Sequence, residues 1–128
     1  MEHEKDESTR DAGGLAEMRE LEKKIDRLHA EDRHAEIVEM LEAAGRDKLD
    51  FALISKWGRA LNNLERFDEA VEFLNSVAEE GADDADWNFR MGFAYYWSGR
   101  QEQALPYFAK AGELNPEDEE ALDYVEDC

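Results

Sequence analysis

The sequence predicts an all-helical domain built from stacked helix pairs, and three observations lead to this prediction. From Leu15 onward, apolar residues recur at steps of three and four, which is the period of an α-helix with one buried face. The chain also matches itself when it is shifted by 34 residues, which indicates a repeated structural unit. No segment shows the apolar–polar alternation that is typical of a half-buried strand.

Helix boundaries follow from these apolar stripes and from the glycines and prolines between them. Residues 1–14 have no apolar period and end in two glycines, which predicts a disordered polar tail before a single domain over residues 15–128. Seven helices are expected in that domain. The first carries the stripe from Leu15 to Leu28, a short second one closes at Gly45, and five more cover about 49–64, 67–80, 85–98, 101–114 and 117–125.

The internal match places small residues on small ones and large residues on large ones. Gly58 falls on Gly92 and Ala70 on Ala104, where two antiparallel helices have to approach closely. A first unit matches at a shift of 33, with Leu21 on Ile54. The expected units therefore cover about 18–50, 51–84 and 85–118, followed by a capping helix over 117–127. The remaining matched pairs of the last two units are Leu61 with Tyr95, Arg66 with Arg100, Leu74 with Phe108, and Val77 with Ala111.

The third unit resembles a tetratricopeptide repeat. Its pattern is Gly92-x-x-Tyr95, then Ala104-x-x-x-Phe108, Ala111 and a closing Pro116. The second unit keeps the small and apolar positions but has Ala82 where the family usually has proline. The resemblance implies a right-handed α-solenoid of three helix-turn-helix repeats plus a C-terminal capping helix. It also implies a concave groove, formed by the first helix of each pair, that binds peptides or protein segments.

The repeat register marks the residues that should line this groove. The first unit offers Arg19, Glu22, Asp26 and His29, and the second also offers Ser55. We predict that the partner-binding residues are Arg59, Asn62, Asn63, Phe89, Arg90, Phe93, Tyr96 and Trp97. The arginines and asparagines could hold a carboxylate or peptide carbonyls, and the aromatic residues could supply apolar anchors. Two alternatives stay open: the aromatic residues pack on neighbouring helices, and the arginines pair with Asp26 or Asp86. Asp86 also stands where some family members have a lysine that grips a C-terminal carboxylate, which argues against a chaperone tail as the ligand.

Composition limits the possible functions. Fifteen basic and 34 acidic side chains give a formal net charge of −19 over 128 residues, so nucleic acid is not expected as a partner because phosphate contacts need clustered Lys and Arg. No leader and no apolar run long enough for a membrane span is evident, and a cytoplasmic location is expected. The single cysteine, Cys128, cannot form an internal disulfide.

Catalysis is not expected either, because no Gly-rich phosphate loop, CxxC pair or HExxH motif occurs. No cofactor is predicted, and His29 and His34 are not expected to bind a metal. The sequence therefore predicts a protein–protein interaction module, an adaptor or assembly factor, that binds a peptide or protein segment in its groove. A monomer is favoured, although the sequence does not fix the oligomeric state. The alternative is a dedicated acidic inhibitor or chaperone that masks a basic protein such as a toxin or secreted substrate.

Overall fold

The structure is a computed structural model that describes residues 2–128, with side chains described from Gly14 onward. Within these residues it contains α-helices and one short 3₁₀ helix and no strand, so the all-helical prediction is confirmed. The helices are α1 (Glu2–Ala30), α2 (His34–Ala44), α3 (Phe51–Asn63), α4 (Phe67–Asn75), α5 (Ala78–Gly81), α6 (Ala85–Trp97), α7 (Gln101–Leu114) and α8 (Glu119–Asp127), with the 3₁₀ helix η1 at Arg46–Lys48.

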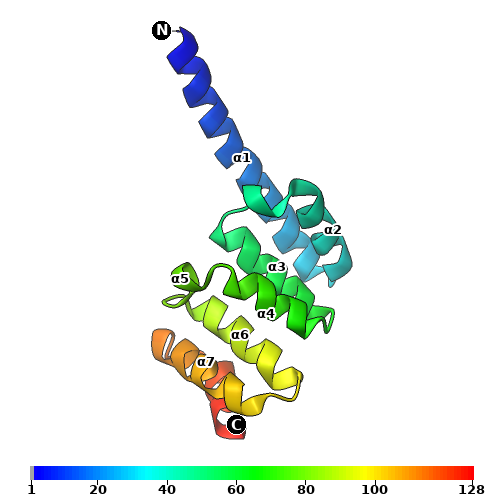
Figure 1. Cartoon of the computed structure of the whole chain (residues 1–128), viewed down its shortest axis with the longest axis vertical. Helices are drawn as coiled ribbons and strands as arrows, with labels where there is room; N and C mark the ends of the chain where they lie inside the picture. Colours follow the sequence, from blue (N-terminus) through cyan, green and yellow to red (C-terminus); the bar gives the residue numbers. More distant parts are fainter. Residues whose placement is uncertain (1) are drawn as a thin grey trace.

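The helices form antiparallel pairs that follow one another along the long axis of the molecule (Figure 1). The pairs are α1 with α2, α3 with α4, and α6 with α7, and α8 packs against α7 at the C-terminal end. The N-terminal part of α1 extends beyond the stack, so the two chain termini lie at opposite ends (Figure 1). This arrangement is an α-solenoid, in which each pair contacts mainly its neighbours along the chain.

The turn inside each helix pair has the same geometry in all three pairs. Asp32, Glu65 and Gly99 occupy corresponding positions and have positive φ angles of 59°, 63° and 84°. The left-handed conformation favours glycine and strains other residues. An arginine follows each of these residues and starts the second helix of the pair. The recurrence of this turn agrees with the shifts of 33 and 34 residues in the sequence.

An aspartate side chain caps the N-terminus of α3, α6 and α8, the helices that follow a complete pair. Asp50, Asp84 and Asp118 precede α3, α6 and α8, and each side chain accepts a hydrogen bond from the backbone N–H three residues later. The three donor–acceptor distances are 3.0, 2.7 and 3.2 Å. Such N-caps satisfy one of the otherwise unpaired N–H groups of a helix and fix where it starts.

Small residues allow the paired helices to approach closely, as the register predicts. Ala70 and Ala104 are both 0% exposed, which confirms their predicted burial. A Cβ added at Gly58 would lie 2.6 Å from Leu74, and a Cβ added at Gly92 would lie 2.9 Å from Phe108. At each glycine, therefore, the space that a side chain would need is occupied by Leu74 or Phe108 of the paired helix. Around these contacts the core consists mainly of aliphatic residues, among them Ile25, Ile37, Leu41, Leu53 and Leu61.

One predicted helix boundary is wrong. The helix expected over 67–80 is interrupted after Asn75, and a separate short helix, α5, follows. The cause is Trp87, whose indole Nε1 donates a hydrogen bond to the Leu74 carbonyl at 2.8 Å and whose ring packs directly against Gly81. The first helix, α1, begins at Glu2, ahead of the apolar stripe that starts at Leu15.

The last helix packs on α7 mainly through two residues other than its leucine. The side chain of Leu122 lies beside Gly112 of α7, but it is 45% exposed. Ala121 is fully buried instead, and the ring of Tyr124 stacks on Phe108 at 4.4 Å between centroids. The helix is rotated in this way because an aromatic cluster on α6 and α7 takes up Tyr124.

Candidate functional site

The first helices of the pairs surround two adjoining hollows, which we call the α3–α6 groove. The first hollow has a volume of about 320 Å³, and the second, of about 300 Å³, shares Asn62, Asn63 and Phe93 with it. The first is lined by His29, Arg59, Asn62, Asn63, Asp86, Phe89, Arg90, Phe93 and Glu120. The second is lined by Asn62, Asn63, Glu65, Phe67, Phe93 and Trp97.

Seven of the eight residues that the sequence singled out line this groove. Six of them line the first hollow, and Trp97 lines the second. Tyr96 lines neither, because its side chain turns toward α8 and its hydroxyl donates a hydrogen bond to Asp127. This bond, together with burial, raises the pKa of Tyr96 to about 12. Among the first-unit candidates, His29 lines the groove, whereas Arg19 is an exposed residue of α1.

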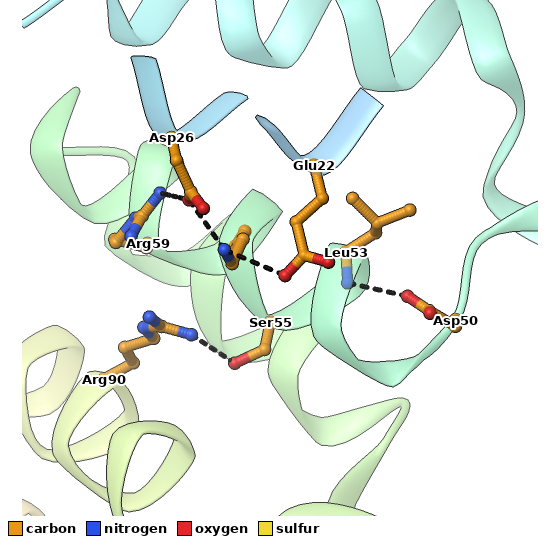
Figure 2. A network of polar contacts seen from close by, with 8 residues as sticks. Glu22, Asp26, Asp50, Leu53, Ser55, Arg59 and Arg90 are labelled. Atoms are coloured by element: carbon orange, nitrogen blue, oxygen red, sulfur yellow. Dashed lines mark hydrogen bonds and ion pairs between the residues drawn. The ribbon is translucent and has the colours of Figure 1, made fainter. Parts of the chain in front are cut away.

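A polar contact between neighbouring pairs sets the position of Arg90. Its Nη1 donates a hydrogen bond of 2.6 Å to Ser55 Oγ on α3 (Figure 2). Asn62, also on α3, donates from Nδ2 to the Arg90 carbonyl oxygen at 3.0 Å. Ser55 and Asn62 are nearly fully buried. These two bonds connect α3 to α6 along the bottom of the groove.

A second network joins α1 to α3 beside the groove. Lys56 Nζ lies 2.6 Å from Asp26 Oδ1 and 3.0 Å from Glu22 Oε2, while Arg59 Nη2 lies 3.4 Å from Asp26 Oδ1. Figure 2 shows Asp26 and Glu22 facing α3 from α1. Burial by itself raises the pKa of Asp26, but the hydrogen bond and charge of Lys56, together with Arg59, lower it overall. The pairing of Arg59 with Asp26 is therefore present, whereas the ion pair considered between Arg90 and Asp86 is not formed.

Several residues in this region carry a buried polar atom that has no hydrogen-bond partner. Among the side chains of residues 14–128, buried atoms without a partner are found on four residues: His29 Nδ1, His34 Nδ1, Arg59 Nε and Asn62 Oδ1. Three of these residues line the first hollow. Unpaired buried polar groups are costly and uncommon in folded proteins. Three of the residues around the first hollow thus carry a polar atom that no group of the described chain satisfies.

Aromatic residues form the apolar side of the groove. Phe89 and Phe93 lie one helical turn apart on α6, with ring centroids 6.3 Å apart, and both pack edge-to-face on Tyr124. Trp97 is 54% exposed, and its Nε1 donates a hydrogen bond to the Tyr124 hydroxyl at 3.0 Å. Phe89 and Phe93 thus pack against α8 and also line the groove. Packing on a neighbouring helix and a position in the groove are therefore not mutually exclusive for these residues.

The sequence did not reveal the part that α8 plays. Glu120 lines the first hollow, and Tyr124 holds the aromatic side chains of α6 in place. The signal available in the sequence was one aromatic residue within a strongly acidic helix. The sequence did not show which side of α8 faces the other helices, so this aromatic residue could not be assigned to the groove.

Residues 85–118, which form the helix pair α6–α7, match the family model of the tetratricopeptide repeat. The chain thus contains a tetratricopeptide repeat in this segment. The matched segment runs from the first residue of α6 to the N-cap of α8, which is the third unit expected from the sequence. No curated protein matches the chain.

Two further properties of the described residues concern metals and membranes. No three His, Cys, Asp or Glu side chains in the described part of the chain are grouped so that they could hold a metal ion. None of its described helices combines the length and apolar character needed to cross a membrane.

Proposed function

We propose that this chain is a cytoplasmic, non-catalytic adaptor or assembly factor that binds an extended segment of a partner protein in the α3–α6 groove. Tetratricopeptide repeats are generally protein–protein interaction modules. The observation that carries the proposal is the composition of the groove. It combines half-buried aromatic side chains with polar atoms that lack partners inside the chain.

The groove suits an extended segment better than a small molecule. Its two hollows adjoin at Asn62, Asn63 and Phe93, so a bound chain could run from one into the other. Asn62 Oδ1 can accept a backbone N–H, and exposed Asn63 can donate to a carbonyl. Phe93 and exposed Trp97 offer apolar surface to side chains that alternate with these polar contacts. Aromatic anchors beside fixed polar groups are typical of interface residues that contribute most of the binding energy.

The test begins with affinity capture of a partner from the source cells, followed by two variants with the same substitution. Asn63→Arg places a long charged side chain in the groove, and we expect it to weaken binding at least about tenfold. Asn75→Arg is the matched control, because Asn75 is also exposed but lies at the end of α4 and lines neither hollow. Both variants should melt like the parent because both positions are exposed. Equal affinity of the two variants for the captured partner would contradict binding in the groove.

A further inference from the structure

Arg90 carries a positive charge that the described part of the chain does not neutralise by an ion pair. Its guanidinium donates one hydrogen bond, to the neutral Ser55 Oγ, and it takes part in no ion pair among residues 14–128. Burial, followed by the charge of Arg59, lowers the pKa of Arg90 to about 10, against the opposing effects of Asp86, Asp84 and Asp26. The side chain therefore stays protonated at neutral pH, in a place where its charge is poorly solvated.

Arg59 adds a second cation to the same hollow. Two cations contact Asp26 Oδ1: Lys56 Nζ at 2.6 Å and Arg59 Nη2 at 3.4 Å. The contact of Arg59 is the longer one. Arg59 Nε is buried and has no partner. The two guanidiniums thus offer more donors than the nearby carboxylates accept. A carboxylate in the hollow would match them, because a guanidinium fork binds its two oxygens with charge-assisted hydrogen bonds.

The acidic groups around the hollow limit how much negative charge can enter. Asp86 and Glu120, both exposed, line the same hollow, and Asp84 uses its side chain to cap α6. The whole chain has a formal net charge of −19. A run of acidic residues in a partner would be repelled by these charges and by the chain as a whole. A single acidic side chain between neutral residues meets the two arginines without that cost.

Building on the proposed function, we infer that Arg59 and Arg90 together bind the carboxylate of one Asp or Glu side chain within the partner segment. The occupant is an internal side chain rather than a chain end, because the groove continues past Asn62 and Asn63 toward Trp97, so the segment has room to extend beyond the anchored residue. Asn62 Oδ1 then accepts a backbone N–H of the same segment, and Phe93 contacts the apolar part of a neighbouring side chain.

The test uses a library of random peptides displayed within a carrier protein, which supplies no free chain ends. Peptides selected on the parent chain should share one acidic position next to an apolar one. A selected peptide is then made with both ends blocked, together with its Glu→Gln or Asp→Asn counterpart. The neutral counterpart should bind the parent at least about tenfold more weakly, as expected for hydrogen bonds to a charged group.

Protein variants locate the effect at the two arginines. In Arg59→Gln and in Arg90→Gln, the preference for the acidic over the neutral peptide should be clearly reduced, because each variant removes one of the two guanidiniums that bind the carboxylate. Arg66→Gln is the control: it removes the same charge from an exposed arginine that pairs with Glu69 outside the groove, and it should keep the full preference. Because Arg90 also holds α3 to α6, that variant could unfold. In that case Arg59→Gln and the peptide substitution on the parent decide the question.

The outcomes separate this inference from the proposed function. Selected peptides without an acidic position would overturn the inference and leave groove binding intact. The inference would also be overturned if Arg66→Gln lost the preference for the acidic peptide as fully as Arg59→Gln does, because general charge attraction would then explain the result. Binding that requires a free C-terminal carboxylate would show that the occupant is a chain end. If no peptide is selected, both the inference and binding of an extended segment fail.

Discussion

The substitution Gly92→Ala tests the packing that holds the last helix pair together. Gly92 lies on α6 opposite Phe108 of α7, and an added Cβ would lie 2.9 Å from three atoms of the Phe108 ring. Phe108 is fully buried, and its other side is stacked on Tyr124. The ring therefore cannot move away without disturbing both α7 and α8. Gly112 of α7 provides the matched control, because it is also a buried glycine within a helix.

The expected magnitude follows from comparing the two glycines. Alanine in place of glycine favours a helix by about 1 kcal/mol, and this gain is common to both variants. At Gly112 the nearest atom to an added Cβ is Leu122 Cδ2 at 3.2 Å, the end of a side chain that is 45% exposed and free to shift. At Gly92 the overlap with Phe108 should cost about 1–3 kcal/mol. Since the helix gain cancels, Gly92→Ala should be less stable than Gly112→Ala by that amount.

Urea and thermal unfolding of the parent and the two variants measure this difference. For a chain of this size, 1 kcal/mol corresponds to roughly 4 °C in Tm. We expect Gly112→Ala to melt at or above the parent temperature and Gly92→Ala clearly below Gly112→Ala. Equal melting temperatures for the two variants would refute the close approach of α6 and α7 at Gly92, and with it the register of the repeat.

Three further predictions concern the turn, the groove and the C-terminal helix. Glu65 has a φ of 63°, so Glu65→Gly should relieve strain and raise the free energy of unfolding by roughly 1 kcal/mol. The control Glu72→Gly, within α4, should lower the free energy of unfolding by about 1 kcal/mol. A loss of stability in Glu65→Gly would contradict the left-handed turn. Burial, followed by the charge of Arg59, lowers the pKa of His29 from 6.5. The unfolded chain therefore binds the proton more readily, and the free energy of unfolding should fall as pH drops through about 6.5. Denaturant unfolding between pH 7.5 and 5 should show a weaker pH dependence in His29→Asn, and an unchanged dependence would contradict the burial of this ring. Deletion of residues 117–128 removes Tyr124 from the Phe108 ring and Leu122 from beside Gly112. Light scattering and thermal melting should then show aggregation or a lowered Tm. Unchanged behaviour would mean that α8 is not docked.

The helix pairing could be predicted from the sequence because small residues leave few ways to pack two helices. Gly58 and Gly92 mark the points of closest approach, and their spacing to Leu74 and Phe108 is the same in both units. The same register fixes which side of α3 and α6 each residue occupies. This is why Arg59 could be expected on the side of α3 that faces the groove, whereas the register placed Arg90 only at its edge.

Features that depend on a single long side chain could not be predicted in this way. The interruption between α4 and α5 arises because Trp87 reaches back to the Leu74 carbonyl and fills the space beside Gly81. Tyr96 turns away from the groove because α8 brings Asp127 within reach of its hydroxyl. In both cases the position of the side chain depended on the packing of a neighbouring element, which the repeat register does not describe.

Site-specific photo-crosslinking tests the central claim, which is that a partner segment binds in the α3–α6 groove. A photoreactive amino acid replaces Asn63 in one variant and Asn75 in another, and each is illuminated with the captured partner. The account predicts efficient cross-links from position 63 to one continuous segment of the partner and few from position 75. Cross-links that form from position 75, or from a probe at Asp123 on acidic α8, but not from position 63, would contradict it.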